Sequence, residues 1–248
     1  MIRFYRKNPL GFAIFWIVVY VISLSLSDIA SAALGPAKSV TLPVSLLLSL
    51  ILYSWITQNR LSSRLGLCPS VLPPHLLLWY VPLIILASVN LWLGAVLNYT
   101  IIETLLYMGA MFCAGFLEEV IFRGFLFQAL LPGGWKSAVL ISSLTFGLGH
   151  LVNLFNGSGA ELFASLLQVC YAFAVGFLFT ILFWRTGSLR ACILTHGTLN
   201  ALSVFANETA RTTVIDSLTA TALTILALAY AFYLLRRTAD DAFYRKSA

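Results

Sequence analysis

The chain has 248 residues, of which 60% are hydrophobic and only 10% are charged, with a mean hydropathy of +0.93. These values exclude a soluble globular domain and are typical of an α-helical protein that crosses a membrane several times. The 15 basic residues outnumber the 9 acidic ones, but they punctuate apolar segments instead of forming a soluble basic module, so nucleic acid is not an expected partner. We expect an all-α polytopic membrane helix bundle that forms a single domain over residues 1–248.

Eight apolar segments have lengths close to the roughly 20 residues that a helix needs to span a bilayer. We predict them at residues 9–27, 40–58, 76–97, 101–131, 136–151, 161–184, 189–206 and 214–235. The fifth segment is short, and the fourth is long enough to require tilting.

The basic residues between these segments predict the orientation of the helices. Placing the amino terminus in the cytoplasm leaves only Lys38 and Arg211 on the opposite side, and Arg123 within a span. The other twelve are then cytoplasmic: Arg3, Arg6, Lys7, Arg60, Arg64, Lys136, Arg185, Arg190, Arg236, Arg237, Arg245 and Lys246. Such a bias follows the positive-inside rule, so both termini are predicted to be cytoplasmic.

Two shorter patterns bear on the first span and on the cysteines. The basic start, the apolar run and Ala30-Ser31-Ala32 imitate a secretory signal and its cleavage site, although the apolar run is longer than a usual signal core. The four cysteines show no paired spacing, so we expect buried free thiols instead of disulfides or a thiolate zinc site. They are Cys68, Cys113, Cys170 and Cys192.

Three charged residues, Glu118, Glu119 and Arg123, lie inside the fourth apolar segment. Each charge at mid-membrane costs roughly 2.5–3.5 kcal/mol on insertion scales, so they must find partners or perform a function. Glu119 and Arg123 are four residues apart, which favours a pair on one helix face, and Glu118 is left without an intrahelical partner. Glu118 and Glu119 point about 100° apart, so both cannot face one cavity squarely. Gly115, one turn earlier, lets another backbone or a substrate approach. Alternatively, Glu118, Glu119 and Arg123 form a purely structural network between helices and have no role in catalysis.

Two histidines fall in later apolar segments. His150 ends the fifth, and His196 lies in the seventh with Asn200 one turn away on the same face. Counting 1.5 Å per residue from the cytoplasmic helix ends, Glu118, His150, His196 and Asn200 lie about 14–21 Å deep. Three helices therefore deliver four polar side chains to one level near the bilayer centre, which predicts a functional site. A lone intramembrane histidine, by contrast, is more often a packing residue.

The ordered motifs Glu118-Glu119-x-x-x-Arg123, Phe146-x-x-x-His150 and His196-x-x-x-Asn200 resemble the CPBP family. This family of eight-span intramembrane proteases includes the CAAX prenyl endopeptidases and bacterial relatives linked to bacteriocin self-immunity. The resemblance covers roughly residues 75–205, with the predicted catalytic core at 101–206, and the first two spans and the last add little beyond topology. It implies a multi-pass protein of the bacterial cytoplasmic membrane.

The resemblance also implies an intramembrane endopeptidase mechanism. Glu118 with His150 would activate a water molecule, and His196 and Asn200 would donate hydrogen bonds to the oxyanion. Glu119 and Arg123 would be a supporting pair, and Asn153 would orient His150. A peptide, a lipidated protein or a membrane-anchored protein is the expected substrate, and the sequence leaves open which.

The sequence is compatible with alternatives for both the cofactor and the function. No cofactor is favoured, but Glu118, His150, His196 and Asn200 could together hold zinc with an open position for water. Against zinc, the chain has no His-Glu-x-x-His helix and asparagine is an uncommon zinc ligand. The rival functions are a non-catalytic immunity or peptide-binding membrane protein and a proton-coupled transporter. The transporter lacks support because no internal repeat is visible.

Overall fold

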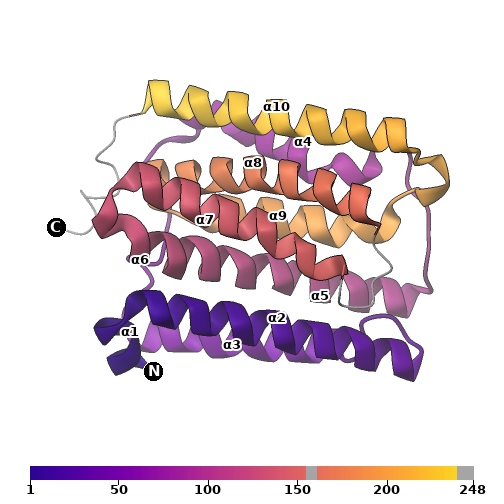
Figure 1. Cartoon of the computed structure of the whole chain (residues 1–248), viewed down its shortest axis with the longest axis horizontal. Helices are drawn as coiled ribbons and strands as arrows, with labels where there is room; N and C mark the ends of the chain where they lie inside the picture. The colour runs from indigo at the N-terminus through magenta and orange to yellow at the C-terminus, as the bar shows by residue number, and fades with distance from the viewer. Residues whose placement is uncertain (155–160, 239–248) are drawn as a thin grey trace.

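A computed structural model describes residues 1–154 and 161–238, and this part of the chain is a bundle of helices without a β-strand. The long helices run side by side along one axis (Figure 1). The α-helices are α1 (Ile2–Lys7), α2 (Pro9–Leu34), α3 (Thr41–Gln58), α4 (Val81–Ala87), α5 (Ile101–Glu119), α6 (Gln128–Leu130), α7 (Trp135–Gly149), α8 (Leu162–Thr186), α9 (Arg190–Leu202) and α10 (Thr213–Arg237). A π-helix, η3 (Val120–Phe127), joins α5 to α6, and 3₁₀ segments occupy η1 (Pro74–Tyr80), η2 (Val89–Leu91), η4 (Leu131–Gly133), η5 (His150–Leu154), η6 (Ser203–Phe205) and η7 (Glu208–Ala210).

Five helical segments of the described chain are long and apolar enough to cross a membrane. They are α2, α3, the continuous stretch Ile101–Gly133, α8 and α10. Ile101–Gly133 has 33 residues, hence about 50 Å of helix against a hydrocarbon core of about 30 Å, which agrees with the predicted tilt of the fourth segment. The helical membrane bundle is therefore confirmed.

The predicted third span, residues 76–97, is wrong as a continuous helix. Only α4 is α-helical there, and its 7 residues cover about 10 Å. Leu78, Trp79 and Tyr80 all have positive φ between 50° and 60°, a conformation that L residues adopt rarely, so the chain turns sharply before α4. α7 and α9, with 15 and 13 residues, are also shorter than a full span. A hydropathy pattern cannot detect such breaks, because the turn residues here are themselves apolar.

The helix starts and ends follow local capping chemistry. The Asn8 side chain accepts a hydrogen bond from the Gly11 amide at the start of α2, where Pro9 occupies the first turn. Thr100 and Glu103 form a reciprocal capping box at the start of α5. Gly187, at φ 61°, ends α8 in the left-handed conformation that glycine adopts without strain.

The two ends of the bundle differ in charge. The Arg64 guanidinium lies over the Tyr5 ring, so the ends of α1 and α3 meet, and Arg185 donates a hydrogen bond to the carbonyl of Thr238, so the ends of α8 and α10 meet. Both pairs lie at one end of the bundle, on the left of Figure 1. All the basic residues predicted to be cytoplasmic that the structure describes belong to segments at this end. Lys38 and Arg211 lie at the opposite end, where Ala37 donates a hydrogen bond to Glu103. We call these the terminal end and the distal end.

Two apolar cores hold the bundle together. One is built around α8 with parts of α4, α7, α9 and α10, and the other around α1, α2, α3 and η3. All four cysteines are free thiols. Cys68 and Cys192 are buried as predicted, whereas Cys113 is half-buried and Cys170 is exposed.

Candidate active site

The site begins at the junction of α5 and η3, where the chain carries Glu118, Glu119 and Arg123. Glu119 and Arg123 are completely buried, and Arg123 Nη1 lies 3.0 Å from Glu119 Oε1. The pair expected from the four-residue spacing is thus present. Removing either partner would leave a buried charge, which typically costs about 3–5 kcal/mol. A π-helical segment begins directly after Glu119, and such segments are frequent at functional sites.

His196 of α9 lies between the two glutamates. Its Nδ1 is 2.7 Å from Glu119 Oε1, and its Nε2 is 3.2 Å from Glu118 Oε2. The two carboxylates point in different directions, as their sequence positions require, yet both reach this imidazole because its two nitrogens face opposite ways. Two carboxylates against one guanidinium leave one negative charge in the cluster, which an imidazolium at His196 would balance.

Two glycines allow α9 to approach α5 this closely. A Cβ on Gly115 would lie 2.7 Å from both the Cα and the amide nitrogen of Gly197, which are backbone atoms that cannot rotate away. A Cβ on Gly197 would lie 2.7 Å from the ring of Phe112. Small residues at a helix contact in this way permit backbone-to-backbone packing. Gly115 therefore admits another backbone, and that backbone carries His196.

Phe146 of α7 organises the other side of the cluster. The Arg123 guanidinium lies 4.2 Å from the centre of its ring, a cation–π contact. The rings of His150 and His196 meet Phe146 edge to face, with centroids 5.3 and 5.6 Å away. The aromatic residue of the second motif thus positions one charged and two titratable side chains.

Tyr20 of α2 is a site residue that the sequence analysis missed. Its hydroxyl donates a hydrogen bond to Glu118 Oε1, so the expectation that the first span adds little beyond topology is wrong. The one signal in the sequence is depth. Tyr20 lies 11 residues beyond the start of α2 at Pro9, about 17 Å into the helix, whereas membrane tyrosines concentrate at the interfaces.

Glu118 lies at the wall of a cavity of about 640 Å³. Tyr20, Phe146, His150 and Asn200 also line it, but His196 does not. The Glu118 side chain is 13% exposed, and its Oε2 accepts no hydrogen bond from the described residues, since the 3.2 Å approach of His196 Nε2 lacks hydrogen-bond geometry. Two smaller cavities, of 290 and 430 Å³, lie away from the glutamates.

The predicted site residues thus fall into two groups. His196 joins Glu119 and Arg123 in the buried cluster and contacts Glu118 without lining the cavity itself. His150 and Asn200 share the cavity with Glu118, but the described residues include no hydrogen bond between His150 and Glu118. The side chain of Asn153 lies outside the described part of the structure.

The arrangement of the candidate metal donors bears on the expectation of a zinc site. Within residues 1–154 and 161–238, no three histidine, cysteine, aspartate or glutamate side chains are grouped so that they could hold a metal ion. His196 directs both ring nitrogens at carboxylates, so binding zinc through it and Glu118 would require rearrangement of the cluster. The set of donors therefore fits a metal poorly as it is arranged.

Comparison with known proteins finds a family similarity over the segment that carries the three motifs. Residues 100–202 match the family model described as Rce1-like, Type II CAAX prenyl endopeptidase Rce1-like. This segment contains Glu118, Glu119, Arg123, His150, His196 and Asn200. No curated protein and no solved structure matches the chain significantly.

Proposed function

We propose that this chain hydrolyses a peptide bond inside the membrane, with Glu118 as the general base. The premise is that it belongs through residues 100–202 to the Rce1-like family of type II CAAX prenyl endopeptidases. The observation that carries this proposal is the position of Glu118. It is the one carboxylate of the cluster that lines the cavity, and its Oε2, although buried, accepts no hydrogen bond from the described residues.

The reaction needs one carboxylate to move a proton twice. Glu118 takes a proton from water as the water oxygen attacks the carbonyl carbon of the substrate, which produces a tetrahedral oxyanion. Glu118 then gives that proton to the amide nitrogen as the carbon–nitrogen bond breaks. General acid–base catalysis of this kind contributes typically about 10²–10⁴-fold to the rate.

The geometry favours an exchange of the roles first expected for the two histidines. His196 is buried and contacts both Glu118 and Glu119, so it would hold the base in position instead of contacting the oxyanion. His150 and Asn200 line the cavity with Glu118, where N–H donors could reach the oxyanion. Glu119 and Arg123 would fix His196, and Tyr20 would fix Glu118 Oε1 through its hydroxyl.

The test is the Glu118→Gln variant, which keeps the size of the side chain and an acceptor for Tyr20 but removes the base. New protein termini in the membrane and secreted proteomes should appear with the wild-type chain and disappear with the variant. In a purified assay on a substrate found in this way, we expect kcat to fall by at least a hundredfold.

Glu161→Gln is the matched control, because Glu161 is exposed and its side chain does not cap α8. It should behave like the wild type. If the folded Glu118→Gln variant cleaves at the wild-type rate, Glu118 is not the base. If neither protein generates new termini while the chain still protects cells against a peptide, the non-catalytic binding function is correct instead.

A further inference from the structure

The cavity of the candidate active site is elongated along α5. It follows one face of α5 from Glu118 to Tyr107, eleven residues towards the distal end. This is a length of about 16 Å, or roughly five residues of extended peptide. α2 forms the opposite wall with Tyr20, Leu24 and Asp28. The cavity therefore runs from the middle of the bundle to its distal end.

At the distal end the cavity reaches polar and exposed groups. Its lining there includes Asp28, Lys38 and Glu208, and the Glu208 side chain is 67% exposed. Between this end and Glu118 the lining includes the apolar side chains Leu24, Met111 and Ala114. Charged and exposed side chains at the distal end are what a water-accessible mouth above a membrane-embedded site requires.

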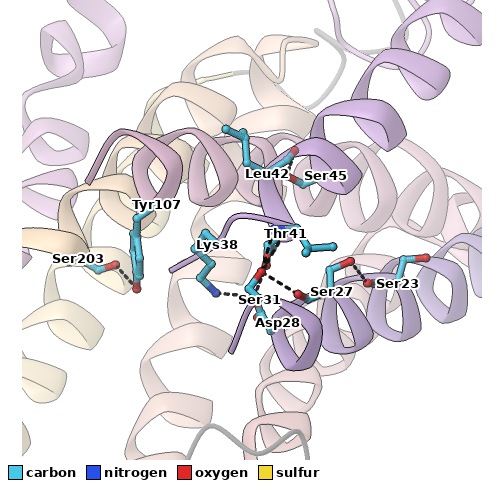
Figure 2. A network of polar contacts seen from close by, with 11 residues as sticks. Ser23, Ser27, Asp28, Ser31, Lys38, Thr41, Leu42, Ser45, Tyr107 and Ser203 are labelled. Carbon is cyan, nitrogen blue, oxygen red and sulfur yellow. Dashed lines mark hydrogen bonds and ion pairs between the residues drawn. The ribbon is translucent and has the colours of Figure 1, made fainter. Parts of the chain in front are cut away.

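A polar network holds this mouth in place. Lys38 lies 2.8 Å from Asp28, and the Thr41 hydroxyl donates to the same carboxylate at 2.6 Å. Ser31 shares a hydrogen bond with Thr41, and the Lys38 ammonium lies over the ring of Tyr107, 5.5 Å from its centre. Figure 2 shows these side chains joining the end of α2 to the start of α3, beside Tyr107 of α5. These contacts thus hold the residues around the mouth in fixed positions.

On the terminal side of Glu118, in contrast, the described side chains fill the space between α2, α3 and η3. Every residue of η3, which continues α5 beyond Glu118 towards the terminal end, is buried. Phe125 of η3 packs edge to face on Phe12 of α2 with centroids 5.1 Å apart, and Phe12 stacks on Trp55 of α3 at 5.1 Å. Tyr5 adds a further edge contact to Trp55 at 5.5 Å. A substrate from the terminal side would have to break this aromatic cluster.

We propose that substrate reaches Glu118 only through the mouth at the distal end, which the distribution of basic residues places outside the cytoplasm. The substrate is then a peptide segment of an exported or membrane-anchored protein, presented from the extracytoplasmic side. A lipidated cytosolic peptide would need a cavity open at the terminal end. The nature of the substrate rests on the proposed endopeptidase function, but the route does not.

The route is tested by labelling single cysteines with a sulfonated thiol reagent that cannot cross membranes. The full-length chain carries Cys113→Ala and Cys170→Ala, which removes the two thiols that are not buried. Ser25→Cys introduces a thiol in the cavity wall, and Ser63→Cys introduces one on the exposed surface of the terminal end. Each is labelled in intact cells and in inverted membrane vesicles.

We expect Ser25→Cys to be labelled in intact cells and Ser63→Cys only in inverted vesicles. Met111→Cys, on the opposite wall of the cavity, should follow Ser25→Cys and serves if that variant does not fold. Labelling of Ser25→Cys and Ser63→Cys from the same side, or of Ser25→Cys from neither, would overturn the route. Labelling of Ser63→Cys in intact cells would overturn the extracytoplasmic assignment. Because labelling needs no catalysis, none of these outcomes depends on whether Glu118→Gln abolishes cleavage.

Discussion

The contact between Gly115 and Gly197 makes the sharpest structural prediction. In Gly115→Ala the new Cβ would lie 2.7 Å from backbone atoms of Gly197, whereas ordinary carbon contacts are about 3.5–4.0 Å, so α5 and α9 must separate by about 1 Å. His196 precedes Gly197, and the 3.2 Å approach of its Nε2 to Glu118 would be lost with that movement. A misplacement of 1 Å can cost about a hundredfold in rate, and we expect a loss of this size in kcat.

The stability change should be smaller than the change in rate. Overpacking typically costs about 1–3 kcal/mol, and replacing glycine by alanine in a helix returns about 1 kcal/mol. Thermal unfolding in detergent should therefore shift down by only a few degrees, while cleavage of a mapped substrate falls strongly.

Gly109→Ala is the matched control, because its Cβ would meet only the end of the flexible Leu42 side chain, at 3.0 Å. It lies on the same helix and should keep both activity and unfolding temperature. A Gly115→Ala variant with wild-type kcat and unfolding temperature would refute the close approach of α9 and the role of His196 that depends on it.

Two further predictions concern the chemistry at Glu118. Tyr20→Phe removes the hydroxyl that donates to Glu118 Oε1; a hydrogen bond to a charged group contributes about 1.5–3 kcal/mol, so kcat should fall roughly ten- to a hundredfold with little change in unfolding temperature. Unchanged kcat would show that Tyr20 only packs. Exhaustive chelation should leave cleavage intact, as measured on the purified enzyme before and after zinc removal, and a loss that added zinc restores would establish a metal mechanism.

The sequence predicted the membrane class and the internal charge pair because both follow from local rules. Hydropathy over about 20 residues needs no knowledge of neighbours, and the pairing of Glu119 with Arg123 depends on helix geometry alone. The same rules gave a wrong prediction for the third span. Leu78, Trp79 and Tyr80 are apolar, yet they turn the chain with positive φ values.

The sequence also predicted that Glu118, His150, His196 and Asn200 lie at one depth in the membrane, but depth is only one of the coordinates that place a side chain. Which histidine meets Glu118 depends on the rotation of α9 and on its distance from α5, and the close approach at Gly115 and Gly197 decides both. The contribution of Tyr20 likewise depends on α2 packing beside α5, a contact between residues 98 positions apart.

Apolar composition, residue spacing and basic flanks thus determine by themselves that this chain is a helical membrane protein with one internally charged helix. Only the tertiary structure decides that His196 bridges the two glutamates, that Tyr20 contacts Glu118, and that the cavity runs from Glu118 towards the distal end. The physical reason is that propensity and hydropathy act along one helix, whereas close packing fixes how helices tilt and rotate against each other. The direction of the cavity depends on that packing, because aromatic side chains fill the space between α2 and η3, whereas a cavity remains between α2 and α5.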